Sequence, residues 1–225
     1  MSGAYLTLLL ADGRLPTGAH TQSAGVEPAL RHGLELVALP EYVAARLTTV
    51  TETEAAVAVV ARHVWRHAAD LDALGAVDRA WRTRTASDAL REASDLLGRS
   101  YLRLAATVWD LGPLMDPATP TGHGVWCRPV VVGVTAAVAG LAAGETARLI
   151  AYDDVQTVIG AALKLRPFDP AVGVSWAAAA GPAVEALVDR VAGLTAPEQI
   201  PARAALQLEE WAQLHQVTER RLFRA

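Results

Sequence analysis

The 225 residues are 52% apolar, which is enough to build the core of one domain without disulfides or metal ions. A single cysteine excludes an intrachain disulfide, and a net charge of −4 without a block of like charge argues against a nucleic-acid-binding protein. The longest apolar runs, 130–144 and 175–184, are shorter than a membrane-spanning helix of roughly 20 residues, and the first residues lack a signal-peptide pattern, so we expect a cytoplasmic protein.

Helical periodicity dominates the predicted elements, beginning at Pro40, a residue suited to a first helical turn. Apolar residues then recur at spacings that place them along one buried face of a helix. They are Val43, Leu47, Val50, Val57, Val60 and Val64. A second amphipathic helix is predicted over residues 87–111, with Ser87 as its N-cap. Its apolar positions are Leu90, Leu97, Leu104, Val108 and Leu111.

The second half of the chain continues the helical pattern after one irregular stretch. Prolines and glycines crowd residues 112–129 and predict an exposed loop inside one domain. Small residues then recur three or four apart from Gly133 to Gly144, which predicts close approach of another helix. Pro182 is expected to start or kink a further helix. Strand signals are weak, so we predict an all-α fold, a single-domain helical bundle spanning residues 1–225.

The motifs of several enzyme classes are absent. The only lysine, Lys164, is followed by leucine, so the Gly-Lys-Ser/Thr end of a phosphate-binding loop is missing. His20, Ser23 and Glu27 have the composition of a nucleophilic triad, but on one helix they would point outward in parallel. The first glycine of a Gly-x-Ser-x-Gly elbow is also missing. We therefore predict a protein that is not an enzyme and has no cofactor.

Two pairs of residues offer weak metal sites. His63 and His67 stand four apart on the first predicted helix, so both imidazoles share one face and could bind nickel or zinc. Two solvated or core-edge histidines are the preferred interpretation, because a third ligand is needed to make a metal site convincing. His123 and Cys127 lie in the predicted loop, where isolated ligands are usually incidental. We expect no metal binding tighter than adventitious.

Three separated segments occur in an order that is typical of one family. They are LPTGAHTQSAGVE (15–27), ALKLRPF (162–168) and LHQVTERRLFRA (214–225). Together they resemble the N-terminal signature, the late-middle motif and the C-terminal tail of the urease accessory protein F (UreF) family. In the first segment Gly18, Ser23, Gly25 and Glu27 stand at matching places. His20 departs from the family pattern, which usually has an aromatic residue there.

Other parts of the chain resemble the same family. Residues 89–103 are similar to its central helix through an Arg-Glu-Ala-Ser sequence that begins at Arg91 and a Gly-Arg pair that ends at Arg99. Residues 129–141 are similar to its Pro-Val-Val-x-Gly helix. Lys164, Pro167 and Phe168 match a Lys-Leu-x-Pro-Phe turn, although Asp-Pro follows where the family often has Gly-Gln. The tail matches at His215, Thr218, Arg221, Leu222 and Phe223.

The resemblance implies a helical homodimer without chemistry of its own. Such a protein binds the accessory protein called D or H, recruits the nickel-carrying GTPase G, and docks with it on apo-urease so that nickel can be inserted. The partner-binding residues implied by the matching motifs, and by the arginines beside them, are Gly18, His20, Ser23, Gly25, Glu27, Arg91, Arg99, Lys164, Pro167, Phe168, His215, Arg220, Arg221, Leu222 and Phe223.

Two of these regions allow an alternative. Residues 214–225 have the composition of a docking tail, in which arginines flank the apolar Leu222 and Phe223, but the last helix could instead pack on its own domain. The turn around Lys164 suits recognition of the GTPase by shape. Alternatively, Lys164 with Arg91 and Arg99 could act on nucleotide in trans, which would make the protein a regulator of GTP hydrolysis.

Overall fold

The computed structural model describes residues 3–115, 125–203, 205–216, 218 and 222–223. All regular structure in this part of the chain is helical, which confirms the all-α prediction. The α-helices are α1 (Gly3–Leu10), α2 (Val26–Arg31), α3 (Leu39–Leu47), α4 (Val50–Ala68), α5 (Leu71–Arg82), α6 (Asp88–Ala106), α7 (Arg128–Ala139), α8 (Ala143–Leu165), α9 (Pro170–Ala179), α10 (Gly181–Val191) and α11 (Leu206–Gln216).

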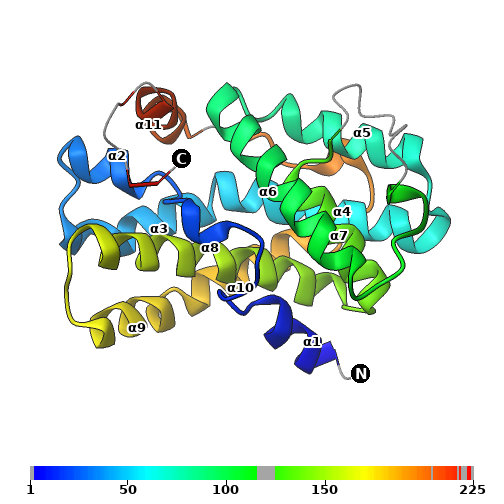
Figure 1. Cartoon of the computed structure of the whole chain (residues 1–225), viewed down its shortest axis with the longest axis horizontal. Helices are drawn as coiled ribbons and strands as arrows, with labels where there is room; N and C mark the ends of the chain where they lie inside the picture. The colour runs from blue at the N-terminus through cyan, green and yellow to red at the C-terminus, as the bar shows by residue number, and fades with distance from the viewer. Residues whose placement is uncertain (1–2, 116–124, 204, 217, 219–221, 224–225) are drawn as a thin grey trace.

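Helix α4 forms the centre of the bundle and packs against α7 and α8 (Figure 1). Its buried face consists mainly of alanine and valine, so neighbouring helices can come close. At Gly133 of α7, a Cβ atom would stand 2.3 Å from the carbonyl oxygen of Ala58, so only glycine fits. The predicted close approach is confirmed there, but Gly140 ends α7 with a φ of 80° and contributes no such contact.

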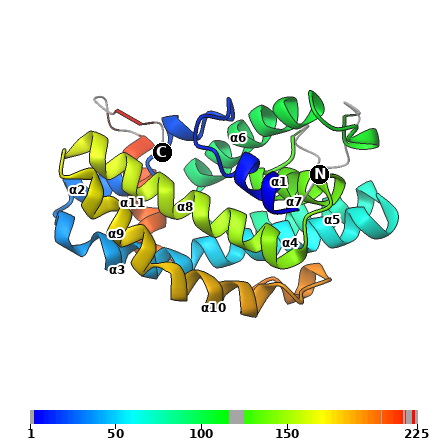
Figure 2. The ribbon, with the colours of Figure 1, turned by 90° about the horizontal axis from the view of Figure 1, so that it is seen from below.

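The outer helices complete the core from both sides. Figure 2 shows α8 running from the left-hand end through the middle of the molecule, with α1 against it and α10 along the lower edge. Helix α6 begins after Ser87, whose hydroxyl accepts the Leu90 amide proton, so this N-cap prediction is confirmed. Helix α10 begins at Gly181 with Pro182 in its first turn and buries its apolar face. The predicted extent and apolar face of the helix over 87–111 are wrong, because α6 ends at Ala106, buries small residues and Tyr101 instead of the predicted leucines within it, and leaves Val108 53% exposed. The predictions for the cap and for α10 hold because they depend on residues only a few positions apart.

The prediction of one continuous helix from Pro40 to Val64 is wrong. The chain breaks at Thr48 and Thr49, and Thr49 has φ −132° and ψ −100°. The Thr49 hydroxyl donates to the carbonyl oxygen of Ala45 at 2.7 Å, and the Thr48 hydroxyl donates to that of Ala44 at 3.2 Å. Hydroxyls that bond to carbonyls one turn back compete with helical bonding, so α3 ends there while the apolar periodicity continues.

The stretch predicted as an exposed loop contributes core residues at both of its described ends, although Gly112, Pro113 and Met115 are exposed. Leu114, Trp126 and Cys127 are 1%, 2% and 0% exposed, respectively. The Cys127 amide donates to the buried carboxylate of Asp78 at 2.9 Å, which fixes the entry into α7. Burial raises the pKa of the Cys127 thiol well above its ordinary value, so this side chain is a core residue and not a poised thiolate. His123 lies outside the described residues.

Among the described residues, one segment, Pro170–Val191, is long and apolar enough to cross a membrane by length and composition, and 22% of its 18-residue apolar stretch is buried. In the structure this segment is divided into α9 and α10 at Ala180. Helix α10 buries Leu187 and Val188 against the bundle. A single segment of this kind is weak support for a membrane span, because the core helices of other proteins can have the same length and composition.

Candidate functional site

The N-terminal signature folds as a compact turn that only glycine permits at two points. Gly18 and Gly25 have φ values of 81° and 78°, in the left-handed region that other residues avoid. At Gly25, a Cβ atom would also stand 2.7 Å from the Tyr42 hydroxyl. His20 sits between them in a 3-10 turn and Ser23 is fully buried, so His20, Ser23 and Glu27 do not share a helix. The expectation that these three side chains lie in parallel on one helix, on which a triad was rejected, is therefore wrong.

A buried ion pair ties this turn to α8. The carbonyl oxygen of Ala24 accepts hydrogen bonds from the Tyr42 hydroxyl at 2.7 Å and from Arg46 Nη1 at 3.0 Å. The Nε and Nη2 atoms of Arg46 donate to the carboxylate of Asp154 at 2.5 to 3.2 Å. The Thr51 hydroxyl donates to the same carboxylate at 2.8 Å. The side chains of Arg46 and Asp154 are 10% and 8% exposed. One arginine thus orients the signature against the centre of the bundle.

Glu27 joins the same signature to the end of the chain. Its carboxylate is 2% exposed and accepts the amide protons of Leu222 at 2.9 Å and Phe223 at 2.8 Å. Arg31, one turn along α2, donates to it at 2.9 Å. His215 Nε2 lies 3.6 Å from the carboxylate and 3.1 Å from the Phe223 carbonyl oxygen. Two motifs that are almost 200 residues apart in sequence therefore meet at one carboxylate.

Electrostatics favour the ionised form of this carboxylate. Burial alone raises the pKa of Glu27. Glu27 accepts hydrogen bonds from the backbone amides of Leu222 and Phe223 and from Arg31. Together these bonds lower the pKa of Glu27 by more than burial raises it, so the pKa lies below its ordinary value. The anion that holds the tail is consequently present at neutral pH.

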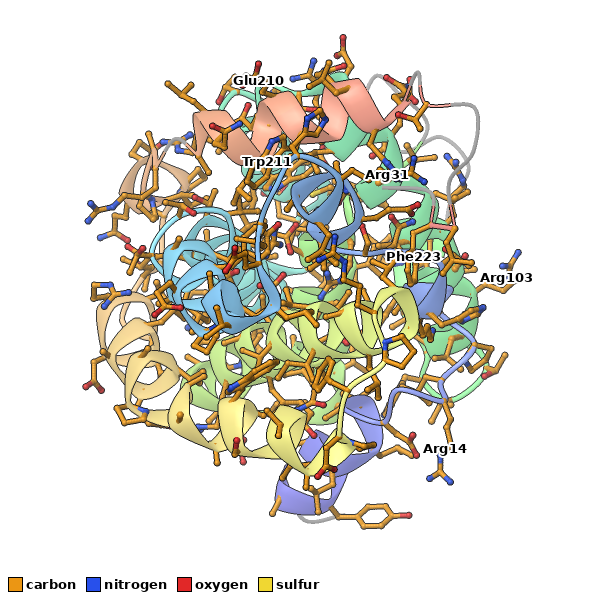
Figure 3. All side chains as sticks on the ribbon, turned by 90° about the vertical axis from the view of Figure 1, so that its left-hand side faces the viewer. Arg14, Arg31, Arg103, Glu210, Trp211 and Phe223 are labelled. Carbon is orange, nitrogen blue, oxygen red and sulfur yellow. The ribbon has the colours of Figure 1, made fainter. Side chains whose placement is uncertain are left out.

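The tail packs on its own chain, which is the geometry that the alternative interpretation describes. Phe223, labelled in Figure 3, is 4% exposed. Lys164 Nζ stands 5.5 Å from the centroid of its ring. Helix α11 reaches the same region and stacks Trp211 on Tyr42, with ring centroids 6.3 Å apart. Leu222 points the other way and is 63% exposed. Of the two apolar tail residues, Leu222 is the one available to another molecule.

An open groove of about 220 Å³ passes beside this contact. It runs between the outer face of α8 and the N-terminal segment, and its lining includes His20, Tyr152, Lys164 and Phe223. Tyr152 is 45% exposed in it. The groove therefore brings together residues from the signature, the Lys164 motif and the tail, which are far apart in sequence.

Comparisons with known proteins agree with the motifs. Residues 37–181, more than half of the chain, match the UreF family. The chain belongs to the UreF family. A urease accessory protein UreF from Mycobacterium sp. (strain JLS) is 36% identical over 218 residues, which are 96% of each chain. One from Mycolicibacterium vanbaalenii is 34% identical over 228 residues, 99% of each chain. Membership of this family gives the chain a role in urease maturation.

The other motif residues of this UreF family member lie on several surfaces. Pro167 is exposed, while the Phe168 ring packs against Trp176 with centroids 5.0 Å apart. Arg99 is exposed on α6. Arg91 is engaged by its own chain, because its guanidinium donates to the Thr85 carbonyl oxygen and pairs with Asp88. Arg220 and Arg221 lie outside the described residues.

The sequence motifs did not predict the roles of three residues, Arg46, Asp154 and Arg31. Arg46 carried a signal, since it stands on the apolar face between Val43 and Val50, where a charge needs a buried partner. The structure shows that Asp154 is the one charged residue on the buried face of α8. Arg31 also carried a local signal, because it stands four residues after Glu27, the spacing of an ion pair on one helix face.

Proposed function

We propose that this UreF family member is a non-catalytic, cytoplasmic scaffold for nickel insertion into urease. In this role it dimerises, binds the accessory protein D or H, and recruits the nickel-carrying GTPase G to apo-urease. The observation that supports it most is the convergence of the signature, the Lys164 motif and the tail around one groove. A docking protein needs a continuous binding surface and no catalytic groups, and these motifs together form a surface of that kind.

The residues around the groove suggest how the partners divide the surface. Leu222 is exposed beside a tail that the chain itself holds, so it suits an apolar contact with the D or H protein. Lys164 and Tyr152 line the groove next to it, and they suit the GTPase. Gly18, Gly25, Glu27 and the other motif residues of the signature act by shaping this surface.

Co-expression with the D or H protein tests the proposal. We expect a complex that contains two copies of this chain and elutes as one species in size-exclusion chromatography with light scattering. Leu222→Asp should weaken that complex while leaving the thermal midpoint unchanged, because the side chain is solvated in the free protein. A monodisperse monomer that ignores the D or H protein at micromolar concentration would contradict the proposal.

Lys164 separates the scaffold from the alternative, a regulator of GTP hydrolysis acting in trans. We expect Lys164→Ala to weaken recruitment of the GTPase in a pull-down and to leave binding of the D or H protein intact. Lys164→Arg keeps the charge and should retain most of the recruitment. If recruitment is unchanged but single-turnover GTP hydrolysis slows, the regulator is the correct function. Engagement of Arg91 by Thr85 and Asp88 already favours the scaffold.

A further inference from the structure

A small cavity lies between the N-terminal segment and the helices behind it. Its volume is about 30 Å³, and its walls come from α6, α7, α8 and the residues that follow α1. Much of the lining is apolar, but it also includes the polar side chains of Thr17, Tyr101, Arg128 and Asp153. The cavity therefore brings polar groups from the N-terminal signature and from three helices to one enclosed place.

The hydroxyl group of Tyr101 is the buried polar group that this cavity can explain. Tyr101 is 7% exposed, and within the described part of the chain its hydroxyl oxygen is buried and has no hydrogen-bond partner. Leaving such a group unpaired costs free energy of folding, and buried hydroxyls in folded proteins are usually paired with a protein group or with ordered water. Burial raises the pKa of Tyr101, so the phenol keeps its proton at neutral pH and can both donate and accept.

The other polar groups of the lining can bond to a small molecule inside it. Arg128 Nη2 donates to one carboxylate oxygen of Asp153 at 2.7 Å, and Arg128 Nη1 lies 3.5 Å from the Glu54 carboxylate. A carboxylate accepts several hydrogen bonds, so Asp153 can accept another from the cavity. Thr17 is 8% exposed, and its hydroxyl can donate or accept. The cavity thus offers the hydrogen-bonding groups that its volume requires of an occupant.

We propose that this cavity is a binding site for ordered water, which connects the Tyr101 hydroxyl with Asp153 and Thr17. A buried water molecule needs about 10–15 Å³ of such volume and 2–4 polar partners, so the cavity has room for about two. The space is too small for an organic ligand, and the Arg128 guanidinium in the lining disfavours a cation. Water held here ties the start of the N-terminal signature to α6 and α8. The site does not depend on the scaffold function.

The thermal midpoint of Tyr101→Phe in the full-length protein tests the site by the direction of its change. If water pairs with the hydroxyl, the substitution removes a hydrogen bond and should lower the midpoint by roughly 2–4 °C. If the hydroxyl is unpaired, its removal ends a desolvation cost, and the midpoint should stay the same or rise. Tyr5→Phe is the matched control, because Tyr5 is 58% exposed and its variant should melt like the wild type. An unchanged or raised midpoint for Tyr101→Phe would overturn the proposal.

Two further measurements show whether the hydroxyl pairs with water and whether Thr17 shares it. Thr17→Val removes the other hydroxyl, so the double variant with Tyr101→Phe should lose less of the midpoint than the sum of the single losses. Strictly additive losses would show that the two hydroxyls do not share water. A crystal structure of the full chain should show ordered water within about 2.5–3.0 Å of the Tyr101 hydroxyl oxygen. A direct bond from that oxygen to a protein group, or a cavity without ordered water, would prove the proposal wrong.

Discussion

Arg46→Met is expected to lower the free energy of unfolding by about 3–5 kcal/mol, because it leaves the buried carboxylate of Asp154 without its partner. It also removes one of the two donors to the Ala24 carbonyl oxygen. For a chain of this size the loss corresponds to a fall of roughly 10 °C in the thermal midpoint. Urea unfolding and calorimetry on the purified variant measure both quantities.

The double variant Arg46→Met with Asp154→Leu is the matched control. Replacing both charges by apolar groups removes the uncompensated carboxylate, so the double variant should be more stable than Arg46→Met alone. If the free energy of unfolding of the double variant falls by the sum of the two single-variant losses, the ion pair does not couple the signature to α8. An Arg46→Met loss under about 1 kcal/mol would contradict the account in the same way.

The same pair predicts a dependence of stability on pH. Burial raises the pKa of Asp154, but Arg46 and Thr51 outweigh it and the pKa lies below its ordinary value. A carboxylate with a lowered folded pKa stabilises the fold fully above its unfolded pKa of about 3.9. That contribution is lost as pH falls through the folded pKa. In Arg46→Met the favourable partner is gone, so this stabilisation by the ionised carboxylate should disappear.

Glu27→Ala is expected to release the tail and to destabilise the fold by about 3 kcal/mol, since it removes a charged acceptor of several buried hydrogen bonds. The amides of Leu222 and Phe223 would lose their partner, and the Phe223 ring would lose its place in the core. Hydrogen exchange at both amides should become fast. Urea unfolding gives the energy, and hydrogen exchange shows where it is lost.

Two variants bracket this result. Glu27→Gln keeps one acceptor oxygen without the charge. Its free energy of unfolding should therefore lie between those of the wild type and Glu27→Ala. Glu35→Ala removes an exposed carboxylate on the surface and should stay within about 0.5 kcal/mol of the wild type. If the amides of Leu222 and Phe223 exchange as slowly in Glu27→Ala as in the wild type, the carboxylate does not hold the tail.

Acid should release the tail for the same reason. Because the pKa of Glu27 is lowered in the folded protein, its stabilising effect is complete above the unfolded pKa of about 4.3 and declines as pH falls below it. The protection factor of the tail amides, which compares their exchange with that of an unstructured peptide at the same pH, should therefore fall under acid conditions. In Glu27→Ala these amides should lack protection at every pH.

The sequence predicts local features of this fold better than distant ones. The cap at Ser87 and the apolar face of α10 follow from neighbouring residues. The break at Thr49 does not, because apolar periodicity continues across a pair of threonines whose hydroxyls replace helical bonds. The contact of Glu27 with Phe223 joins residues 196 positions apart, and nothing in either segment names its partner.

The candidate site likewise combines residues that the sequence predicts with contacts that only the fold shows. The family motifs identified Glu27, Lys164 and Phe223, but only the structure shows that the tail lies on its own chain and that Leu222 stays exposed. A charge on an apolar face, such as Arg46, is the kind of local signal that should prompt a search for a buried partner. The identity of that partner, Asp154, still requires the fold.

The nickel content of urease tests the central claim most directly. Urease should be co-expressed with the D or H protein and the GTPase, with and without this chain, and its nickel measured after purification. The account predicts loaded, active urease only when the chain is present, and poor loading with Leu222→Asp. The nickel concentration of the medium must be low enough for loading to depend on the accessory proteins. Under that condition, equal nickel content in urease with and without the chain would contradict the account.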